Sequence, residues 1–351
     1  MGEREVTAVP APDDGHLLPH TPTLADLARE AGTSRSTASR ALSGRGYVSP
    51  DARDRLMAAA ERLGYVPNAS ARTLKQRRSN VVGVIVSDLG NQFYARLAAG
   101  IEQVLRERGY HMVIVGDNSD GTEELTAART FLAMHAPGVI ITPGAPDATG
   151  FLLRRGIPVV EVDRRMSEQP CDAVVIDNVR GGRMAVEHLL ALGHTRIAHL
   201  GVHTDFTSDA GRLEGYRQAH AAAGVPLDER LVLRVALHEE TVAERITGLL
   251  ARESPTAIFA ANNILAMQAW RAIRARGLAL PDDVSLVGFD DVQWMEMVSP
   301  SITVVDQPTF ELGRRAAALL LRRLEEPVSA PTAELLQPSL LVRASTAPPR
   351  L

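Results

Sequence analysis

The chain has 351 residues, of which 45% are hydrophobic and 23% are charged, and its formal net charge is −4. Because a single hydrophobic core stops growing at about 250 to 300 residues, we expect two or three domains. The composition excludes disordered, collagenous and disulfide-scaffold proteins. The single cysteine, Cys171, excludes an intramolecular disulfide and a thiolate metal site, and it is consistent with a reducing cytoplasm.

Residues 1–20 carry four acidic residues and one arginine, and they lack the continuous apolar stretch of a signal peptide. We expect a disordered leader there. The sequence contains no uncharged apolar run of 18 residues, which excludes a membrane span. The expected location is therefore the cytoplasm, without a membrane partner.

Charge is unevenly distributed along the chain. Residues 21–79 contain 11 Lys and Arg against 5 Asp and Glu, a net charge of +6, whereas the leader carries −3 and residues 80–351 carry the remaining −7. A small basic module in front of a large acidic body is typical of a polyanion-binding domain attached to a second function.

The basic module contains three predicted helices. Apolar residues recur at i, i+3, i+4 and i+7 from Leu24 to Ala31, with Thr23 as N-cap and Gly32 as terminator. A short second helix, Arg35 to Leu42, follows a cap at Thr33 or Ser34. A third helix begins at Ser49-Pro50 and ends at Gly64.

The first two helices, separated by a glycine-containing turn, predict a helix-turn-helix. Its second helix enters the major groove of DNA, where its N-terminal side chains meet base edges. The exposed side of this helix carries Arg35, Ser36, Ser39 and Arg40. A small helical bundle with a solvated charged face is the alternative interpretation of the same pattern.

This module resembles the DNA-binding headpiece of the lactose/galactose repressor family of bacterial transcription regulators. The motifs A-G-x-S-x-x-T-x-S-R (31–40), Y-V-P-N (65–68) and A-R-x-L-K (71–75) have the order and spacing of that family, and the similarity continues to Thr346. The sequence departs from the family at Ala38, where valine is more common. By helix position and resemblance together, the DNA contacts expected in the headpiece, residues 21–66, are Thr23, Ser34, Arg35, Ser36, Thr37, Ser39 and Arg40.

The resemblance implies a hinge at residues 67–80, whose helix from Asn68 to Lys75 forms when two subunits meet over the minor groove of the operator. Paired Leu74 side chains would then push between central base steps. Packing of Leu74 against the third helix is the alternative, and Arg72, Lys75, Arg77 and Arg78 are either phosphate contacts or a solvated linker. The hinge residues expected on DNA are Asn68, Ala71, Arg72, Leu74 and Lys75.

From Val81 onward, short apolar runs alternate with helical stretches, which predicts parallel sheets covered on both faces. The number of units exceeds one sheet, so we expect two similar lobes. The fold class is thus α/β, with a small all-α headpiece. Five of the apolar runs end in a polar residue: Asp88, Asp163, Asp177, Asn262 and Asp290. Ligands of such folds bind beyond the carboxyl ends of the strands, although each of these residues could instead cap the next helix.

The body resembles a periplasmic sugar-binding protein with two lobes and three crossing segments. This implies an effector domain at 81–346, with an N-lobe of about 81–176 and 307–336, a C-lobe of about 177–306 and 337–346, and a tail at 347–351. The effector contacts implied are Phe93, Tyr94, Asp163, Arg212, Asn262 and Asp290. An ion pair with Asp209 or Glu214 is the alternative role for Arg212. The chain departs from the family at Gln92 (usually proline), at Asn263 (usually aspartate) and at Leu237-His238, where several relatives place an aromatic wall.

The sequence contains no G-x-G-x-x-G, Walker lysine, G-x-S-x-G or H-E-x-x-H motif, so we expect neither an enzyme nor a cofactor. His199 and His203 are four residues apart in a predicted strand and its exit, where this spacing does not form a metal site. A solute-binding protein or a sugar-processing enzyme of similar fold is the alternative. The prediction is a transcription regulator, most simply a repressor, that binds double-stranded palindromic operator DNA as a homodimer and responds to a carbohydrate or nucleoside effector.

Overall fold

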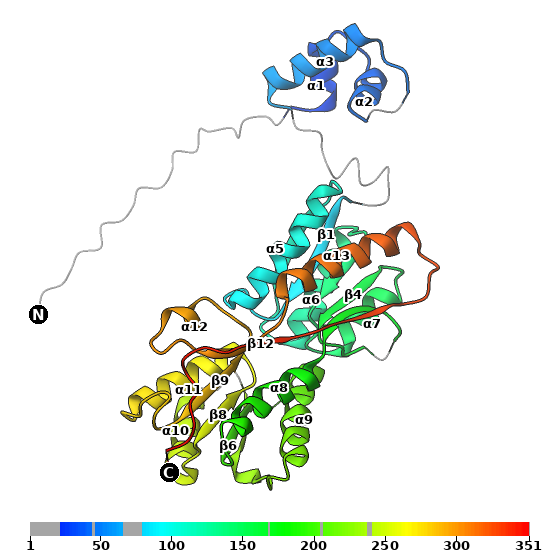
Figure 1. Ribbon diagram of the computed structural model, residues 1–351. Helices are drawn as coiled ribbons and strands as arrows, with labels where there is room; N and C mark the ends of the chain where they lie inside the picture. The colour runs from blue at the N-terminus through cyan, green and yellow to red at the C-terminus, as the bar shows by residue number, and fades with distance from the viewer. Residues whose placement is uncertain are drawn as a thin grey trace, which may run out of the picture. The chain divides into compact units, whose positions relative to one another are not determined.

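The computed structural model describes residues 22–43, 46–65, 79–167, 169–203, 206–236 and 241–350. The chain divides into two compact units, Met1–Arg77 and Arg78–Leu351 (Figure 1). The expected hinge residues Asn68, Ala71, Arg72, Leu74 and Lys75 lie outside the described residues, and so do Leu237 and His238. In the part of the chain that is described, no helix is long and apolar enough to cross a membrane.

The first unit contains the three predicted helices, α1 (Leu24–Glu30), α2 (Arg35–Ser43) and α3 (Pro50–Leu63). Their core consists of fully buried aliphatic side chains, among them Leu27, Ala38 and Leu56. Ala38, where the family more often has valine, is thus a core residue.

Side-chain caps fix the ends of these helices. Thr23 forms a capping box with Asp26 at the start of α1. Of the two caps considered for α2, the structure selects Ser34, whose Oγ accepts a hydrogen bond from the Thr37 backbone N–H at 3.1 Å. Ser49 caps α3, and Gly64 ends it with a left-handed φ of 61°. The two short helices and their turn therefore form the predicted helix-turn-helix.

The second unit contains two six-stranded sheets with the same pattern of strand order, which confirms the predicted α/β class with two lobes. The N-lobe sheet has the order β11-β5-β4-β3-β1-β2 and the C-lobe sheet the order β12-β10-β9-β8-β6-β7. All pairs are parallel except β10 and β12. The strands of the N-lobe are β1 (Val81–Val86), β2 (His111–Gly116), β3 (Val139–Ile141), β4 (Val159–Asp163), β5 (Asp172–Ile176) and β11 (Ala333–Leu336). Those of the C-lobe are β6 (Ile197–Val202), β7 (Val232–Val235), β8 (Ala257–Ala260), β9 (Ser285–Phe289), β10 (Thr303–Asp306) and β12 (Ser339–Leu341).

Helices cover both faces of each sheet, because both faces are apolar. In the N-lobe these are α5 (Gln92–Glu107) and α13 (Thr309–Glu325) on one face and α6 (Gly121–Ala133) and α7 (Pro146–Leu153) on the other. In the C-lobe they are α8 (Asn178–Ala191) and α9 (Thr207–Ala222) on one face and α10 (Val242–Glu253) and α11 (Asn263–Ala275) on the other, with the short helices η1 (Glu229–Leu231) and α12 (Trp294–Met297) in the connections.

The chain crosses between the lobes three times: after β5, after β10, and between β11 and β12 (Figure 1). The short strands β11 and β12 come last in the chain, and each lies at an edge of its sheet. Three crossings in close proximity leave the two lobes joined but separate, with the carboxyl ends of their central strands facing a common cleft.

Two helix pairs pack at unusually short range through glycine. A Cβ on Gly215 of α9 would lie 2.1 Å from the carbonyl oxygen of Val179, and one on Gly182 of α8 would lie 2.2 Å from that of Arg212. In the N-lobe, Gly100 and Gly313 bring α5 and α13 together in the same manner. Because the α8–α9 contact includes the backbone of Arg212, it also fixes the position of that side chain.

Candidate functional site

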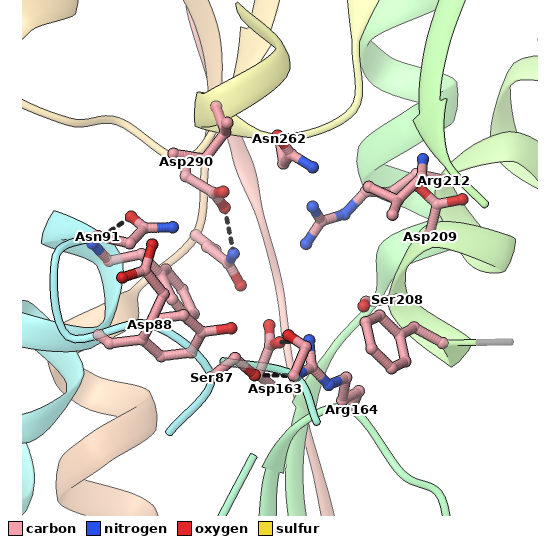
Figure 2. A pocket seen from close by; sticks show the side chains of 17 residues that line it. Ser87, Asp88, Asn91, Asp163, Arg164, Ser208, Asp209, Arg212, Asn262 and Asp290 are labelled. Atoms are coloured by element: carbon pink, nitrogen blue, oxygen red, sulfur yellow. Dashed lines mark hydrogen bonds and ion pairs between the residues drawn. The ribbon is translucent and has the colours of Figure 1, made fainter. Parts of the chain in front are cut away.

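A cavity of about 180 Å³ lies between the two lobes, at the carboxyl ends of β1, β4, β6, β8 and β9 (Figure 2). All six residues expected to contact an effector line it: Phe93, Tyr94, Asp163, Arg212, Asn262 and Asp290. They come from both lobes, and 197 residues separate the first from the last. Folding therefore brings together the polar strand ends and the aromatic pair that the sequence indicated separately.

The five polar strand ends have different roles. Asp88, Asp163, Asn262 and Asp290 line the cavity. Asp177 does not; its Oδ1 accepts a hydrogen bond from the Arg180 N–H at 2.9 Å and caps α8, as the alternative interpretation allowed. Asn262 combines both roles, because its Oδ1 caps α11 through the Leu265 N–H at 2.8 Å while its side chain borders the cavity.

Arg212 projects from α9 into the cleft (Figure 2). Its Nε donates to Asn178 Oδ1 at 2.9 Å and its Nη1 to the carbonyl oxygen of Ala261 at 2.6 Å. The ion pair with Asp209 or Glu214 that the sequence left open is not formed. Two neutral acceptors hold the guanidinium, whose Nη2 has no hydrogen bond within the described residues, so a charged donor remains for a ligand.

Asp163 and Asp290 both have left-handed backbones, with φ of 72° and 67°. Asp tolerates this conformation better than most residues, and here it turns each carboxylate toward the cleft (Figure 2). Asp163 is 5% exposed, and burial raises the pKa of its carboxyl group although Arg164 and Arg212 oppose the shift. It accepts no hydrogen bond from the described part of the chain and lies 3.8 Å from Arg164 Nη1.

Sequence reasoning missed Arg164, Phe206, Ser208 and Gln307, which also line the cavity. Arg164 donates to the Pro143 carbonyl oxygen at 2.7 Å and to Ser87 Oγ, and its guanidinium carbon lies 3.9 Å from the centroid of the Phe206 ring. This stacking joins the two lobes across one side of the cleft. The only sequence signal for any of these residues was that a polar residue, Arg164, directly follows the strand end at Asp163.

Asp209, which also lines the cavity, was considered only as a partner of Arg212. Its Oδ1 accepts a hydrogen bond from the Val202 N–H at 2.9 Å, and burial raises the pKa of its carboxyl group. Its other oxygen is buried without a partner in the described structure. Asp209 thus ties the end of β6 to the first turn of α9 and supports the cavity wall.

The departures at Gln92 and Asn263 do not line this cavity. Instead, Gln92 Oε1 accepts a hydrogen bond from the Gln293 N–H at 3.0 Å, and Asn263 Nδ2 donates to Asn91 Oδ1 at 3.1 Å. In both cases the two partners belong to different lobes. The side chains that depart from the family pattern therefore contact the opposite lobe next to the cavity.

The expected DNA-contacting residues of the first unit lie on and around α2. Arg35, Ser36 and Arg40 are exposed, and Thr37 and Ser39 are half-buried. Arg40 Nε donates to the Ser36 carbonyl oxygen at 3.3 Å, which holds the arginine along the helix surface. Ser34 Oγ lies 2.8 Å from the hydroxyls of both Ser36 and Thr37, and Thr23 is engaged in its capping box.

The two histidines do not form a metal site. His199 is fully buried in β6 against Tyr216 and Phe259, and burial lowers its pKa to about 3. His203 is exposed beyond the strand. Within the described ranges no group of three His, Cys, Asp or Glu residues is arranged to hold a metal ion.

Comparison with known proteins assigns both units. The family model for bacterial regulatory proteins of the lacI family matches residues 23–68, and a periplasmic binding protein-like domain matches residues 186–346. The transcriptional regulator DegA of Bacillus subtilis (strain 168) is 36% identical over 331 residues, which cover 93% of this chain and 98% of DegA. The regulator CelR of Thermobifida fusca is 36% identical over 334 residues, covering 92% and 98%.

Solved structures agree with this relationship. The complex of transcriptional regulator CelR with cellobiose has a TM-score of 0.71 and 34% identity, covering 92% of this chain and 99% of that one. The lac repressor dimer bound to operator and the anti-inducer ONPF has a TM-score of 0.80 and 28% identity, covering 93% and 99%. With a helix-turn-helix unit, a two-lobed α/β unit and relatives that match almost its entire length, the chain belongs to the lacI family of bacterial regulatory proteins and is a DNA-binding transcription regulator.

Proposed function

We propose that the protein represses transcription as a dimer on a palindromic operator, and that a small uncharged sugar in the interlobe cavity controls its affinity for DNA. The observation that carries this proposal is that two groups lie in one cavity lined by aromatic rings: Arg212 Nη2, which makes no hydrogen bond in the described structure, and the buried Asp163, which accepts none there. The chain's similarity to CelR in complex with cellobiose and to the lac repressor bound to operator supports the same conclusion.

The polar groups around the cavity suit hydroxyl groups, which donate and accept at once. Asp163 is available as an acceptor. Arg212 Nη2 and Asn262 Nδ2 are available as donors, because the cap on α11 fixes the amide of Asn262 with its oxygen toward the helix. Phe93 and Tyr94 form an edge-on pair with ring centroids 5.0 Å apart and supply an apolar wall for the faces of a sugar ring.

The charge around the cavity favours an uncharged ligand over an anionic one. Four carboxylates line it, against the guanidinium groups of Arg164 and Arg212. A phosphorylated or acidic sugar would bring negative charge close to this excess of carboxylates, which is unfavourable at the low dielectric of a closed cleft. The carboxylates concerned are Asp88, Asp163, Asp209 and Asp290.

For DNA recognition we propose the residues expected from the sequence. Arg35, Ser36, Ser39 and Arg40 read base edges from α2, and Thr23, Ser34 and Thr37 support contacts to the backbone. The hinge residues Asn68, Ala71, Arg72, Leu74 and Lys75 bind the minor groove as a pair of helices. We also propose the domain limits expected from the sequence: a headpiece at 21–66, a hinge at 67–80 and an effector domain at 81–346.

The two activities are linked through the lobes. A ligand that binds one relative arrangement of the lobes more tightly shifts the population toward it, and the N-lobes carry that change to the two hinges of the dimer. By reciprocity, operator DNA changes the affinity for effector by the same factor. We propose that the protein acts by binding alone, and we assign it no catalytic residue.

A thermal-shift screen of the purified full-length protein tests the effector class. A panel of neutral mono- and disaccharides, their phosphate esters and nucleosides is compared, because a ligand at 100 times its Kd stabilises the folded state by about 2.7 kcal/mol. A neutral sugar should raise Tm and change operator affinity in a second assay. Stabilisation by phosphate esters or nucleosides alone would contradict the proposed effector class. In the variant Asp163→Asn, the rise in Tm caused by the sugar should be lost.

A further inference from the structure

Two side chains that depart from the family pattern meet the opposite lobe at the same place, beside the cavity. Gln92 begins α5 of the N-lobe and Asn263 begins α11 of the C-lobe. Gln92 accepts from the Gln293 N–H at 3.0 Å, and Asn263 donates to Asn91 Oδ1 at 3.1 Å. Neighbouring positions on both lobes thus contribute a direct hydrogen bond across the cleft.

The Asn263 amide is a branched donor. Its Nδ2 reaches Asn91 Oδ1 in the N-lobe and Asp290 Oδ2 in its own lobe at 3.2 Å, and the residue is only 3% exposed. Asp290 also accepts from Gln307 Nε2, which belongs to the segment that crosses from β10 to α13. Asp290, which lines the cavity, is therefore connected to Asn91 through Asn263 and to a crossing segment through Gln307.

The residue types at these positions are dictated by their neighbours. Asn91 Oδ1 already accepts from the Phe93 N–H at 3.0 Å, so both partners of Asn263 Nδ2 are acceptors. Aspartate at position 263 has no side-chain donor when ionised, and its carboxylate would adjoin that of Asp290. Proline at position 92 has no side-chain acceptor for the Gln293 N–H. The interlobe bonds exist because this chain has an amide at both positions.

We propose that Asn263 and Gln92 are lobe-coupling residues: they hold the two lobes together beside the cavity and set how much of the binding free energy of the effector is required for closure. As an account of regulation, this rests on the proposed function, because it assigns an effector to the cleft. Contacts within the protein that favour the closed lobe arrangement increase the fraction of molecules that can bind the effector. The apparent Kd for the effector falls in proportion.

The test measures lobe separation in the full-length protein without any sugar. Dyes are attached to cysteines introduced at the exposed positions Glu107 in the N-lobe and Glu244 in the C-lobe, with Cys171, which is buried, replaced by alanine. Energy transfer between the dyes then reports the distribution of lobe distances. Asn263→Asp removes both donated bonds, and Gln92→Met removes the accepted bond while keeping a side chain of similar length.

The matched control is Gln218→Glu. It makes the same amide-to-carboxylate change, because Gln218 Nε2 donates to Glu214 Oε1 at 2.9 Å, but on the exposed surface of α9 within one lobe. We expect Asn263→Asp to shift the distribution toward larger separations and Gln92→Met to do so to a smaller extent, whereas Gln218→Glu leaves it unchanged. Equal distributions for Asn263→Asp, Gln92→Met and Gln218→Glu would overturn the proposal.

A second measurement separates this inference from the effector class. Where a sugar binds the parent protein, Asn263→Asp should weaken its affinity by up to about tenfold, because the lost interlobe bond to the neutral Asn91 amide contributes about 0.5 to 1.5 kcal/mol. Unchanged sugar affinity together with an unchanged lobe distance refutes the coupling role. If no sugar binds any variant but the lobe distance still shifts in Asn263→Asp, the coupling role stands and the sugar assignment fails. Because Gln92 is exposed at the start of α5, Gln92→Met keeps the test valid if Asn263→Asp does not fold.

Discussion

The guanidinium carbon of Arg212 lies 3.7 Å from the centroid of the Phe289 ring. Phe289 is the last residue of β9 and is fully buried, so the arginine emerges from the strand ends over an aromatic surface. Stacking on one face, together with the bonds to Asn178 and Ala261, leaves the guanidinium one orientation. The remaining nitrogen, Nη2, therefore points its N–H groups into the cleft without any adjustment on binding.

We predict that Arg212→Lys abolishes the effector response although it conserves charge. An ammonium cannot stack flat on Phe289 and donate to Asn178 and Ala261 simultaneously. Loss of a charged hydrogen bond corresponds to about 1.5 to 3 kcal/mol, or roughly 10- to 150-fold in effector affinity. Calorimetry with the effector found by thermal shift checks this, and operator binding measured by fluorescence anisotropy should match wild type. A normal effector response in Arg212→Lys would show that the effector binds at another site.

Arg40→Ala should relax base preference at one position in each operator half-site. An arginine that contacts guanine contributes roughly 1 to 3 kcal/mol of discrimination. The measurement compares dissociation constants on the cognate operator and on single-base variants at fixed salt. Equal losses on cognate and scrambled DNA would instead assign Arg40 to a phosphate contact.

The substitution Leu74→Ala should weaken specific operator binding severely. Leu74 lies outside the described residues. The stretch 67–79 has Leu74 as its only large apolar residue, and the helix expected at 68–75 would be far shorter than the roughly 12 to 15 residues at which isolated helices become marginal. Insertion of the leucine between base steps supplies the missing burial. Nonspecific, salt-sensitive binding should persist. Specific affinity within twofold of wild type at the same salt concentration would refute the wedge.

Arg323→Met should lower the free energy of unfolding by about 3 to 5 kcal/mol. Asp172 is 2% exposed and accepts from Arg323 Nε at 2.7 Å and Nη2 at 2.9 Å, so the substitution leaves a buried carboxylate without its charged partner. Urea denaturation of Arg315→Met provides the control, because that arginine forms an exposed pair with Glu311 and should change stability by about 1 kcal/mol or less. The double variant Arg323→Met/Asp172→Asn should recover part of the loss.

The stability of wild type should fall between about pH 5 and pH 8 because of Glu124. Burial raises the pKa of this carboxyl group from 4.5 to about 8, and Asp117 beside it adds to the shift. A folded-state pKa above the unfolded value means that the stabilising proton is fully present below pH 4.5 and is lost as the pH rises through 8. Glu124→Gln should flatten this slope, which one proton limits to about 1.4 kcal/mol per pH unit. Glu123→Gln, an exposed neighbour, should retain it.

Mostly apolar runs allowed the central strands to be predicted, because both faces of these strands are buried. The polar residues within them, Glu161 in β4 and His199 in β6, are themselves buried. Two edge strands lack such a run: Arg234 interrupts β7, with sequence VLRV, and β11, with sequence AELL, is short and half-exposed. Neither pattern differs from that of a loop. Their strand character comes from the neighbouring strands β6 and β5, to which they pair.

The cavity could be predicted where its residues end strands, and less well elsewhere. Asp163, Asn262 and Asp290 follow from the rule that ligands bind at the carboxyl ends of strands. Arg212 followed from resemblance alone, since no local pattern distinguishes it from the other arginines on helix surfaces. Phe206 and Gln307 escaped prediction because they reach the cavity from a loop and a crossing segment, whose courses depend on how the lobes pack.

Asn262 and Asn91 each cap a helix and also border the cleft. Because each residue has both roles, substitutions at these two positions are restricted during evolution. A substitution that alters ligand preference at either position also removes a cap, at a cost of about 0.5 to 2 kcal/mol in a protein of limited stability. Ser208, Ile264 and Val202 line the same cavity but cap no helix. New effector preferences should therefore arise first at these three positions, while the two asparagines persist across regulators that respond to different sugars.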